Sequence, residues 1–133
     1  IGYNFRLPNL NAALGCAQLE QLPDKLIAKR ALFKKYQTAF APIEGANLIS
    51  EPTQCQSNYW LQTIMLNADQ AHQRDAILHA TNQAELMTRP VWRLLHHLTP
   101  FANCPSMCLA MAEHLEKRLI NIPSSPHLLR KVE

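Results

Sequence analysis

Apolar residues recur every three to four positions in four stretches of the chain, and short apolar runs separate these stretches. The helical spacing predicts helices over residues 10–21, 24–41, 70–82 and 107–119. The short runs, rich in β-branched and aromatic residues, predict strands over 48–50, 59–66, 86–88 and 120–122. Helices that alternate with only a few strands are typical of a small α+β layer domain.

Polar residues and prolines mark the predicted helix starts. Asn9, Asp69 and Ser106 each precede a periodic run, so we expect them to act as N-caps. Pro23 is expected in the first turn of the helix over 24–41, where a missing N–H costs nothing.

The predicted helix over 10–21 carries mostly small residues, among them Ala13, Gly15, Cys16 and Ala17. A glycine inside a helix costs about 1 kcal/mol relative to alanine. We therefore expect Gly15 to mark a close approach of another element, and Cys16 to be buried in that contact.

The next helix carries an apolar stripe and a basic cluster. The stripe includes Ile27, Leu32 and Phe33, which we expect to face the core. The cluster is read as the solvated face of this helix, because the net charge of +3 is too diffuse for nucleic-acid binding. Its members are Lys25, Lys29, Arg30, Lys34 and Lys35.

Length and composition fit one cytoplasmic domain. The 133 residues are 47% hydrophobic, which suffices for a core without disulfides, and no apolar run is long enough to span a bilayer. The four cysteines therefore suggest a reducing compartment. Cys104, Cys108 and His114 form the best zinc candidate, but no second ligand pair accompanies them, so we expect no metal.

Two clusters of polar residues could bind a ligand or take part in catalysis. Asn4 and Arg6 lie in a loop before the first helix, where an amide and a guanidinium suit an anion such as phosphate. The segment 89–101 gathers Arg89, Trp92 and His96 with further aromatic, basic and proline residues. That composition indicates either a site-lining loop or a surface loop packed under the domain.

Residues 2–19, GYNFRLPNLNAALGCAQL, closely resemble a segment of the DegT/DnrJ/EryC1/StrS aminotransferases. Residues 57–61, 88–92, 94–96, 101–105 and 120–125 continue the resemblance in the right order, toward members that serve legionaminic-acid-type and perosamine-type sugar pathways. The resemblance covers essentially the whole chain. It implies the small C-terminal domain of a fold-type I enzyme, with a short, mostly antiparallel sheet packed with helices.

The resemblance also implies a function. Such enzymes use pyridoxal phosphate to move an amino group from glutamate to a nucleotide-linked 4-keto-6-deoxy sugar, as homodimers. The match places Asn4 and, less directly, Arg6 at the cofactor phosphate of the neighbouring subunit. It places His96, Trp92 and Arg89 at the sugar nucleotide, although Leu94 stands where a proline is usual.

The same resemblance bears on what the chain contains. The chain starts at Ile1, and none of its lysines stands in the motif of the lysine that holds the cofactor. We therefore expect residues 1–22 to join a large cofactor domain, residues 23–133 to form the small domain, and this piece alone to be inactive. A sugar dehydratase that lacks the lysine, and a non-catalytic interaction domain, remain alternatives.

Overall fold

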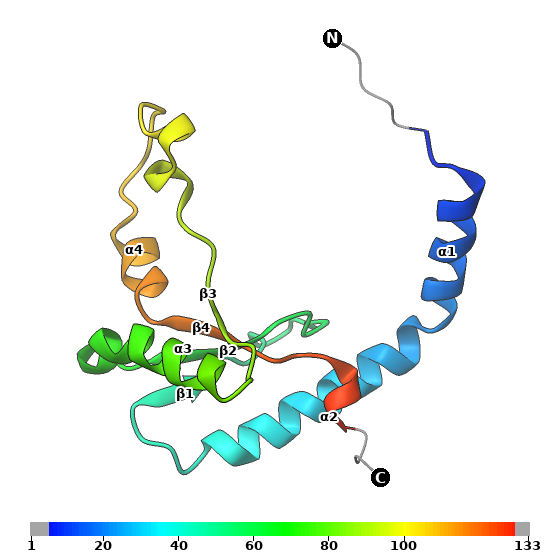
Figure 1. Ribbon diagram of the computed structural model, residues 1–133, viewed down its shortest axis with the longest axis horizontal. Coiled ribbons are helices and arrows are strands. Elements are labelled where there is room, and N and C mark those ends of the chain that lie inside the picture. Colours follow the sequence, from blue (N-terminus) through cyan, green and yellow to red (C-terminus); the bar gives the residue numbers. More distant parts are fainter. Residues whose placement is uncertain (1–5, 130–133) are drawn as a thin grey trace.

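The computed structural model describes residues 6–129. Its helices and strands follow the predicted alternation, with short 3₁₀ turns between them (Figure 1). The helices are α1 (Asn9–Glu20), α2 (Leu22–Phe40), α3 (Arg74–Gln83) and α4 (Ala110–Glu116). The strands are β1 (Ala46–Leu48), β2 (Gln62–Leu66), β3 (Arg89–Pro90) and β4 (Leu119–Ile122). The 3₁₀ turns are η1 (Ala68–Gln73), η2 (Leu95–His97), η3 (Thr99–Phe101) and η4 (Pro126–Leu129).

The four strands form one sheet in the order β1-β2-β4-β3. Every neighbouring pair is antiparallel, and Ile64 of β2 lies opposite Ile120 of β4 in the centre. This arrangement confirms the predicted α+β class with a short antiparallel sheet.

The core lies on one face of β2 and β4. Side chains of a strand alternate between its two faces, so Ile64 and Leu66 point the same way, as do Ile120 and Ile122. Aromatic residues of α2 and Ile77 and Leu78 of α3 pack against these four residues. The sheet, α2 and α3 therefore form a packed body, which contains the fully buried Ile120.

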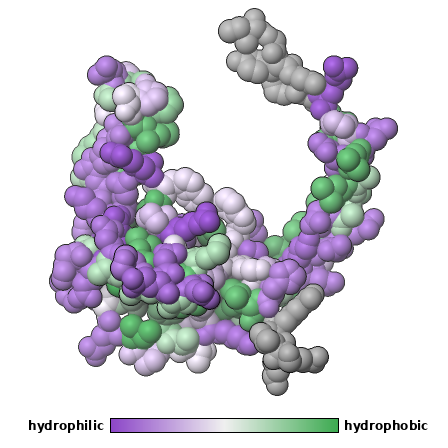
Figure 2. All heavy atoms as spheres, viewed as in Figure 1, coloured by the Kyte–Doolittle hydropathy of each residue, from purple (hydrophilic) through white to green (hydrophobic). Residues whose placement is uncertain are grey.

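Two arms extend from this body in Figure 1. One is α1, in which no residue is buried. The other, which we call the second arm, is residues 91–109, and it also contains no buried residue. Figure 2 shows hydrophobic atoms exposed along α1 and near the tip of the second arm. The apolar residues of both arms thus lack the burial that stabilises the body.

The predicted N-caps are wrong. Asn9 is the first residue of α1, Ala68 begins η1 ahead of Asp69, and α4 begins at Ala110, well after Ser106. No side chain caps any of these three starts by a hydrogen bond. The residue types at these positions favour N-caps, but none of their side chains accepts a backbone N–H from the first turn of the helix.

Three predicted strands shift, and the one predicted over 48–50 lies at Ala46–Leu48. The strand predicted over 59–66 starts at Gln62, because Tyr59 has a left-handed φ of 46° that a strand residue cannot adopt. The strand predicted over 86–88 lies at Arg89–Pro90 instead, with Pro90 opposite Ile120. Because β3 is an edge strand, its proline leaves no partner unpaired.

Expectations for the two long helices are corrected in part. Cys16 is exposed, and a side chain added at Gly15 would meet nothing within 4 Å. Ile27 is 68% exposed, while Leu32 and Phe33 are buried as expected. The predicted contact of the small-residue face is therefore absent within the described part of the chain.

Candidate functional site

A groove of about 800 Å³ opens along β3 and the end of β4. Residues 85–92 form one wall, and residues 121–125 together with Trp60 form the other. Most of the lining is apolar, including Leu86, Val91 and Ile122. Concave apolar surfaces with a few polar groups are the usual form of small-molecule sites, so this groove is the candidate site.

Two tryptophans face each other in the groove. The rings of Trp60 and Trp92 are nearly parallel, at 24°, with centroids 6.0 Å apart. Both side chains are largely exposed, at 64% and 68%. Flat aromatic surfaces of this kind bind planar or ring-shaped ligands by stacking.

Polar residues stand at the rim of the same groove. Arg89 supplies a guanidinium from β3, opposite Asn121 of β4 in the sheet register. Ser124 and Ser125 add hydroxyl groups from the segment after β4, and Glu85 adds a carboxylate. An arginine beside an aromatic pair combines a ligand for phosphate with a stacking surface.

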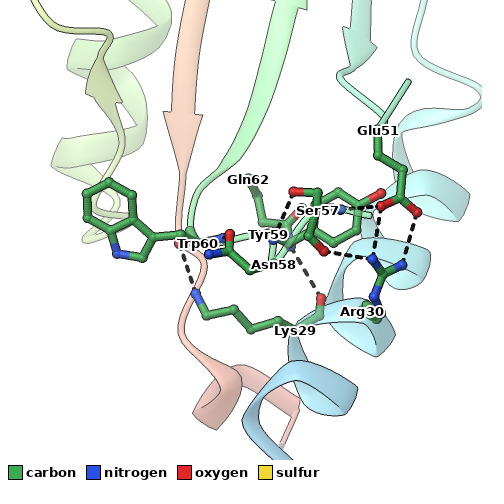
Figure 3. Close-up of polar contacts among 8 residues, drawn as sticks. All are labelled: Lys29, Arg30, Glu51, Ser57, Asn58, Tyr59, Trp60 and Gln62. Atoms are coloured by element: carbon green, nitrogen blue, oxygen red, sulfur yellow. Dashed lines mark hydrogen bonds and ion pairs between the residues drawn. The ribbon is translucent and has the colours of Figure 1, made fainter. Parts of the chain in front are cut away.

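Lys29 of α2 joins two segments of one wall of the groove, and Figure 3 shows its contact with Trp60. Its ammonium donates to the carbonyl oxygens of Trp60, at 2.8 Å, and Ser124, at 2.9 Å. The hydroxyl of Ser124 donates to the same Trp60 carbonyl at 2.9 Å. Partial burial lowers the pKa of Lys29. This side chain is thus a structural link, in contrast to the solvated role expected from the sequence.

Arg30 also departs from the expected solvated role. Its guanidinium binds both carboxylate oxygens of Glu51, at 3.0 and 2.9 Å, and the carbonyl of Ser57 at 2.7 Å (Figure 3). The Ser57 N–H donates to Glu51 at 2.6 Å. The hydrogen bond from Arg30, followed by that from Ser57, lowers the pKa of Glu51 to about 2. This network fixes the loop that leads to Trp60.

Tyr59, the residue before Trp60, is held in place by packing against α2. Its buried ring stacks on Phe33 of α2 at a centroid distance of 4.2 Å, and Arg30 lies 5.4 Å from the ring centre. Gln62, at the start of β2, is also buried, and its amide donates to the carbonyl of Lys29 at 3.4 Å. With Tyr59 fixed inward, Trp60 is turned outward into the groove.

The structure brings together some of the predicted site residues. Arg89 and Trp92 both line the groove. His96 lies elsewhere, in η2, where its Nε2 contacts Glu113 of α4 at 3.1 Å. Residues 89–92 of the segment 89–101 thus line the groove, whereas His96, farther along the second arm, does not.

The predicted phosphate ligands lie at the start of the chain. Arg6 is exposed in the extended segment that leads into α1. Asn4 lies outside the described residues. A guanidinium such as that of Arg6 suits a phosphate chemically, because it offers several donors in one plane.

The rival zinc candidate is not assembled. Cys104 and Cys108 are exposed, and His114 contacts Arg118, with 2.6 Å between His114 Nε2 and Arg118 Nη1. Within residues 6–129, these three residues do not form a group of converging ligand atoms.

Sequence reasoning missed Trp60 and Lys29 as parts of the site. Trp60 follows Asn58, whose side chain accepts the Trp60 N–H at 2.9 Å and so helps to form the turn before β2. A polar pair followed by two aromatic residues just before a strand was the available signal. The role of Lys29 depends on contacts 31 and 95 residues away, which no local pattern reveals.

The sequence matches a known protein family over nearly its whole length. The model of the DegT/DnrJ/EryC1/StrS aminotransferase family matches residues 1–132. The chain therefore belongs to the DegT/DnrJ/EryC1/StrS aminotransferase family.

Curated relatives agree with the family. The chain is 31% identical to EpsN of Bacillus subtilis, whose name assigns it to the pyridoxal phosphate-dependent aminotransferases. It is also 31% identical to the GDP-perosamine synthase of Escherichia coli O157:H7. Each match covers 96% of this chain and 34% of the relative, so the chain spans about one third of their length.

Solved structures show the same fold. PseC of Helicobacter pylori, an aminotransferase involved in the biosynthesis of pseudoaminic acid, superimposes with a TM-score of 0.86 at 19% identity. That match covers 96% of this chain and 35% of PseC. CalS13 of Micromonospora echinospora, a sugar aminotransferase, gives 0.80 at 20% identity, over 98% of this chain and 33% of CalS13. None of the helices described here is both long and apolar enough to cross a membrane.

Proposed function

We propose that this chain is the small domain of a pyridoxal phosphate-dependent enzyme that transfers an amino group from glutamate to a nucleotide-linked 4-keto-6-deoxy sugar. The complete enzyme is proposed to be a cytoplasmic homodimer in surface-polysaccharide biosynthesis. The observation that carries the proposal is the groove, in which Arg89 and the two tryptophans offer the contacts that a nucleotide sugar needs.

In this proposal, the groove binds and orients the nucleotide sugar. Arg89 binds the diphosphate, because a guanidinium can donate two parallel hydrogen bonds to phosphate oxygens. The exposed ring surface of Trp92, which stacks on Trp60, offers a flat apolar face to a ring of the ligand. Lys29 holds two segments of one wall together through its contacts with the carbonyls of Trp60 and Ser124.

His96 is proposed to approach the sugar in the assembled enzyme. In this chain its Nε2 faces Glu113, and it does not line the groove. Its contact with substrate would therefore come from the second arm, at a part of the ligand that extends beyond the groove.

The cofactor site is proposed to include the start of the chain. Arg6 suits the cofactor phosphate because a planar guanidinium offers several donors, and Asn4 is proposed to add an amide donor. Pyridoxal phosphate, when bound, supplies the electron sink for the amino transfer. The task of these two residues is to hold and orient the phosphate end.

The covalent attachment of the cofactor is proposed to lie on a separate large domain. Among the described residues, no lysine lines the groove, and the ammonium of Lys29 is already bound to two carbonyls. Residues 1–22 are proposed to join that large domain, which accords with the exposed surface of α1. We expect this chain, mixed with pyridoxal phosphate, to show no visible band of a covalently attached cofactor. A stable band would contradict this part of the proposal.

Ligand binding to the groove can be tested directly, because the only two tryptophans of the chain both line it. Titration with GDP-linked, UDP-linked and dTDP-linked hexoses should change tryptophan fluorescence saturably for at least one of them, while free hexose should not. Arg89→Ala should weaken binding roughly 10-fold or more, the worth of a charge-assisted hydrogen bond.

Arg93→Ala is the matched control, since Arg93 is exposed and does not line the groove. It should bind like the parent chain. If no nucleotide sugar changes the fluorescence, or if Arg89→Ala and Arg93→Ala behave alike, the groove is not the nucleotide-sugar site.

A further inference from the structure

Two adjacent histidines and a glutamate converge at the base of the second arm. His96 and His97 belong to η2, and Glu113 belongs to α4, the helix that follows the arm. One ligand atom from each of the three lies within 4.8 Å of the others. Neither histidine lines the groove, so this cluster is separate from the candidate site.

The distances within the cluster suit a small cation. His96 Nε2 lies 3.1 Å from Glu113 Oε1, and His97 Nε2 lies 3.9 Å from the same oxygen. Tetrahedral zinc with bonds of about 2.0–2.2 Å to nitrogen and oxygen keeps its ligand atoms about 3.3–3.5 Å apart. Small side-chain rotations therefore bring all three atoms into contact with one ion.

A second carboxylate orients one of the histidines. Glu116 Oε2 lies 3.5 Å from His97 Nδ1, on the opposite side of the ring from Glu113. Glu116 is itself fixed, because its Oε1 accepts the N–H of Leu94 at 3.1 Å and its side chain is only 16% exposed. A carboxylate that accepts the proton of one ring nitrogen leaves the other nitrogen unprotonated and directed to a metal, a recurrent arrangement in zinc sites.

The donor groups of the cluster are of the kinds that bind transition metals. The two imidazole rings are tilted against each other with centroids 4.0 Å apart, and the carboxylates of Glu113 and Glu116 lie beside them. Imidazole ligands suit zinc and its neighbours among the transition metals, whereas magnesium and calcium prefer oxygen ligands.

We propose that His96, His97 and Glu113 bind one zinc ion, with Glu116 orienting His97 and the fourth position open to water. The site joins η2 to α4 and so fixes the second arm to the helix that follows it. None of these residues lines the groove, but His96 is also the residue proposed to approach the sugar, so zinc bound at His96 would hold that side chain in the second arm.

The test is metal binding to the purified chain after removal of metals. Calorimetry near neutral pH should show one zinc bound per chain, and cobalt in its place should give visible bands without thiolate charge transfer. His97→Ala and Glu113→Gln should each abolish saturable binding, while Glu116→Gln should weaken it roughly 10- to 100-fold. Circular dichroism shows whether each variant is folded, and Glu113→Gln keeps the test valid if His97→Ala is not.

Two controls exclude other ligands. His79→Ala removes an exposed histidine of α3 and should leave zinc binding unchanged. The Cys104→Ser, Cys108→Ser double variant should also bind normally, because these exposed cysteines lie outside the cluster. The proposal fails if the chain takes up no zinc saturably, if His97→Ala and Glu113→Gln bind it like the parent chain, or if binding is lost in the cysteine variant.

Discussion

The body and the two arms of this molecule use similar residues in opposite ways. In the body, Ile64 and Ile120 are buried between the sheet and the helices that cover it. In α1, Leu10 and Leu14 are 80% and 61% exposed, and in the second arm Met107 is 89% exposed. Both regions contain many apolar residues, but only those of the body are buried by packing within the chain.

The body is thus stabilised by contacts within the chain, whereas the apolar residues of the arms remain accessible to other surfaces. Burial of apolar area is worth about 25 cal/mol per Å², so exposed leucines contribute little to the stability of the isolated chain. The body should therefore set the free energy of unfolding, while changes in the arms should leave it nearly unchanged.

The strongest test of this comparison replaces one residue in each region. Ile120→Ala removes the most buried side chain of the sheet and should lower the free energy of unfolding by about 3 kcal/mol, within the range of 2–5 known for such cavities. Leu14→Ala, on the exposed face of α1, should change it by about 0.5 kcal/mol or less. Urea denaturation followed by circular dichroism measures both; equal losses would mean that α1 is packed as tightly as the body.

A second test concerns the polar links of the body. Lys29→Met removes a donor from two carbonyls, of which only the Ser124 contact is partly buried, and should cost about 1 kcal/mol. It should also alter tryptophan fluorescence, since Lys29 joins Trp60 to Ser124 in one wall of the groove. Lys34→Met, at an exposed position of the same helix, is the matched control and should change neither. An unchanged stability in Lys29→Met would show that the link is dispensable.

The smallest expected effect is a pH dependence. The folded-state pKa of Glu51 is about 2, below its ordinary value of 4.5, so the folded state favours the charged form. The stability that Glu51 contributes is therefore complete above pH 4.5 and is lost as the pH falls from 4.5 toward 2. Glu51→Gln should remove that part of the acid dependence, whereas Glu44→Gln, in an exposed turn, should retain it. Identical acid profiles for Glu51→Gln and the parent chain would refute the role of this pair.

The periodic parts of the fold follow from the sequence. The helices α1 and α2 lie within two residues of their predicted bounds, because long periodic runs leave little choice of structure. Short elements were displaced. Tyr59 turns inward onto Phe33 and delays β2, and Pro90 lies in β3 because an edge position tolerates it. Both effects arise from tertiary contacts that a local pattern does not contain.

The site was predictable only where its residues are close in sequence. Arg89 and Trp92 were placed together because they belong to one short segment, and they line one groove. Trp60 lines the same groove from a distant segment, and Lys29 of α2, which does not line it, contacts the Trp60 carbonyl. The histidine cluster was missed as a cluster because Glu113 lies 17 residues from His96 in the sequence.

The position of β4 has a consequence for synthesis on the ribosome. It is the last strand among the described residues, yet it lies between β2 and β3 in the sheet. In the native pairing, β2 has only β1 as a partner until residues 119–122 emerge, so its other edge stays open to other strands. The nascent polypeptide thus carries an open strand edge from the synthesis of β2 until that of β4, when the sheet can close.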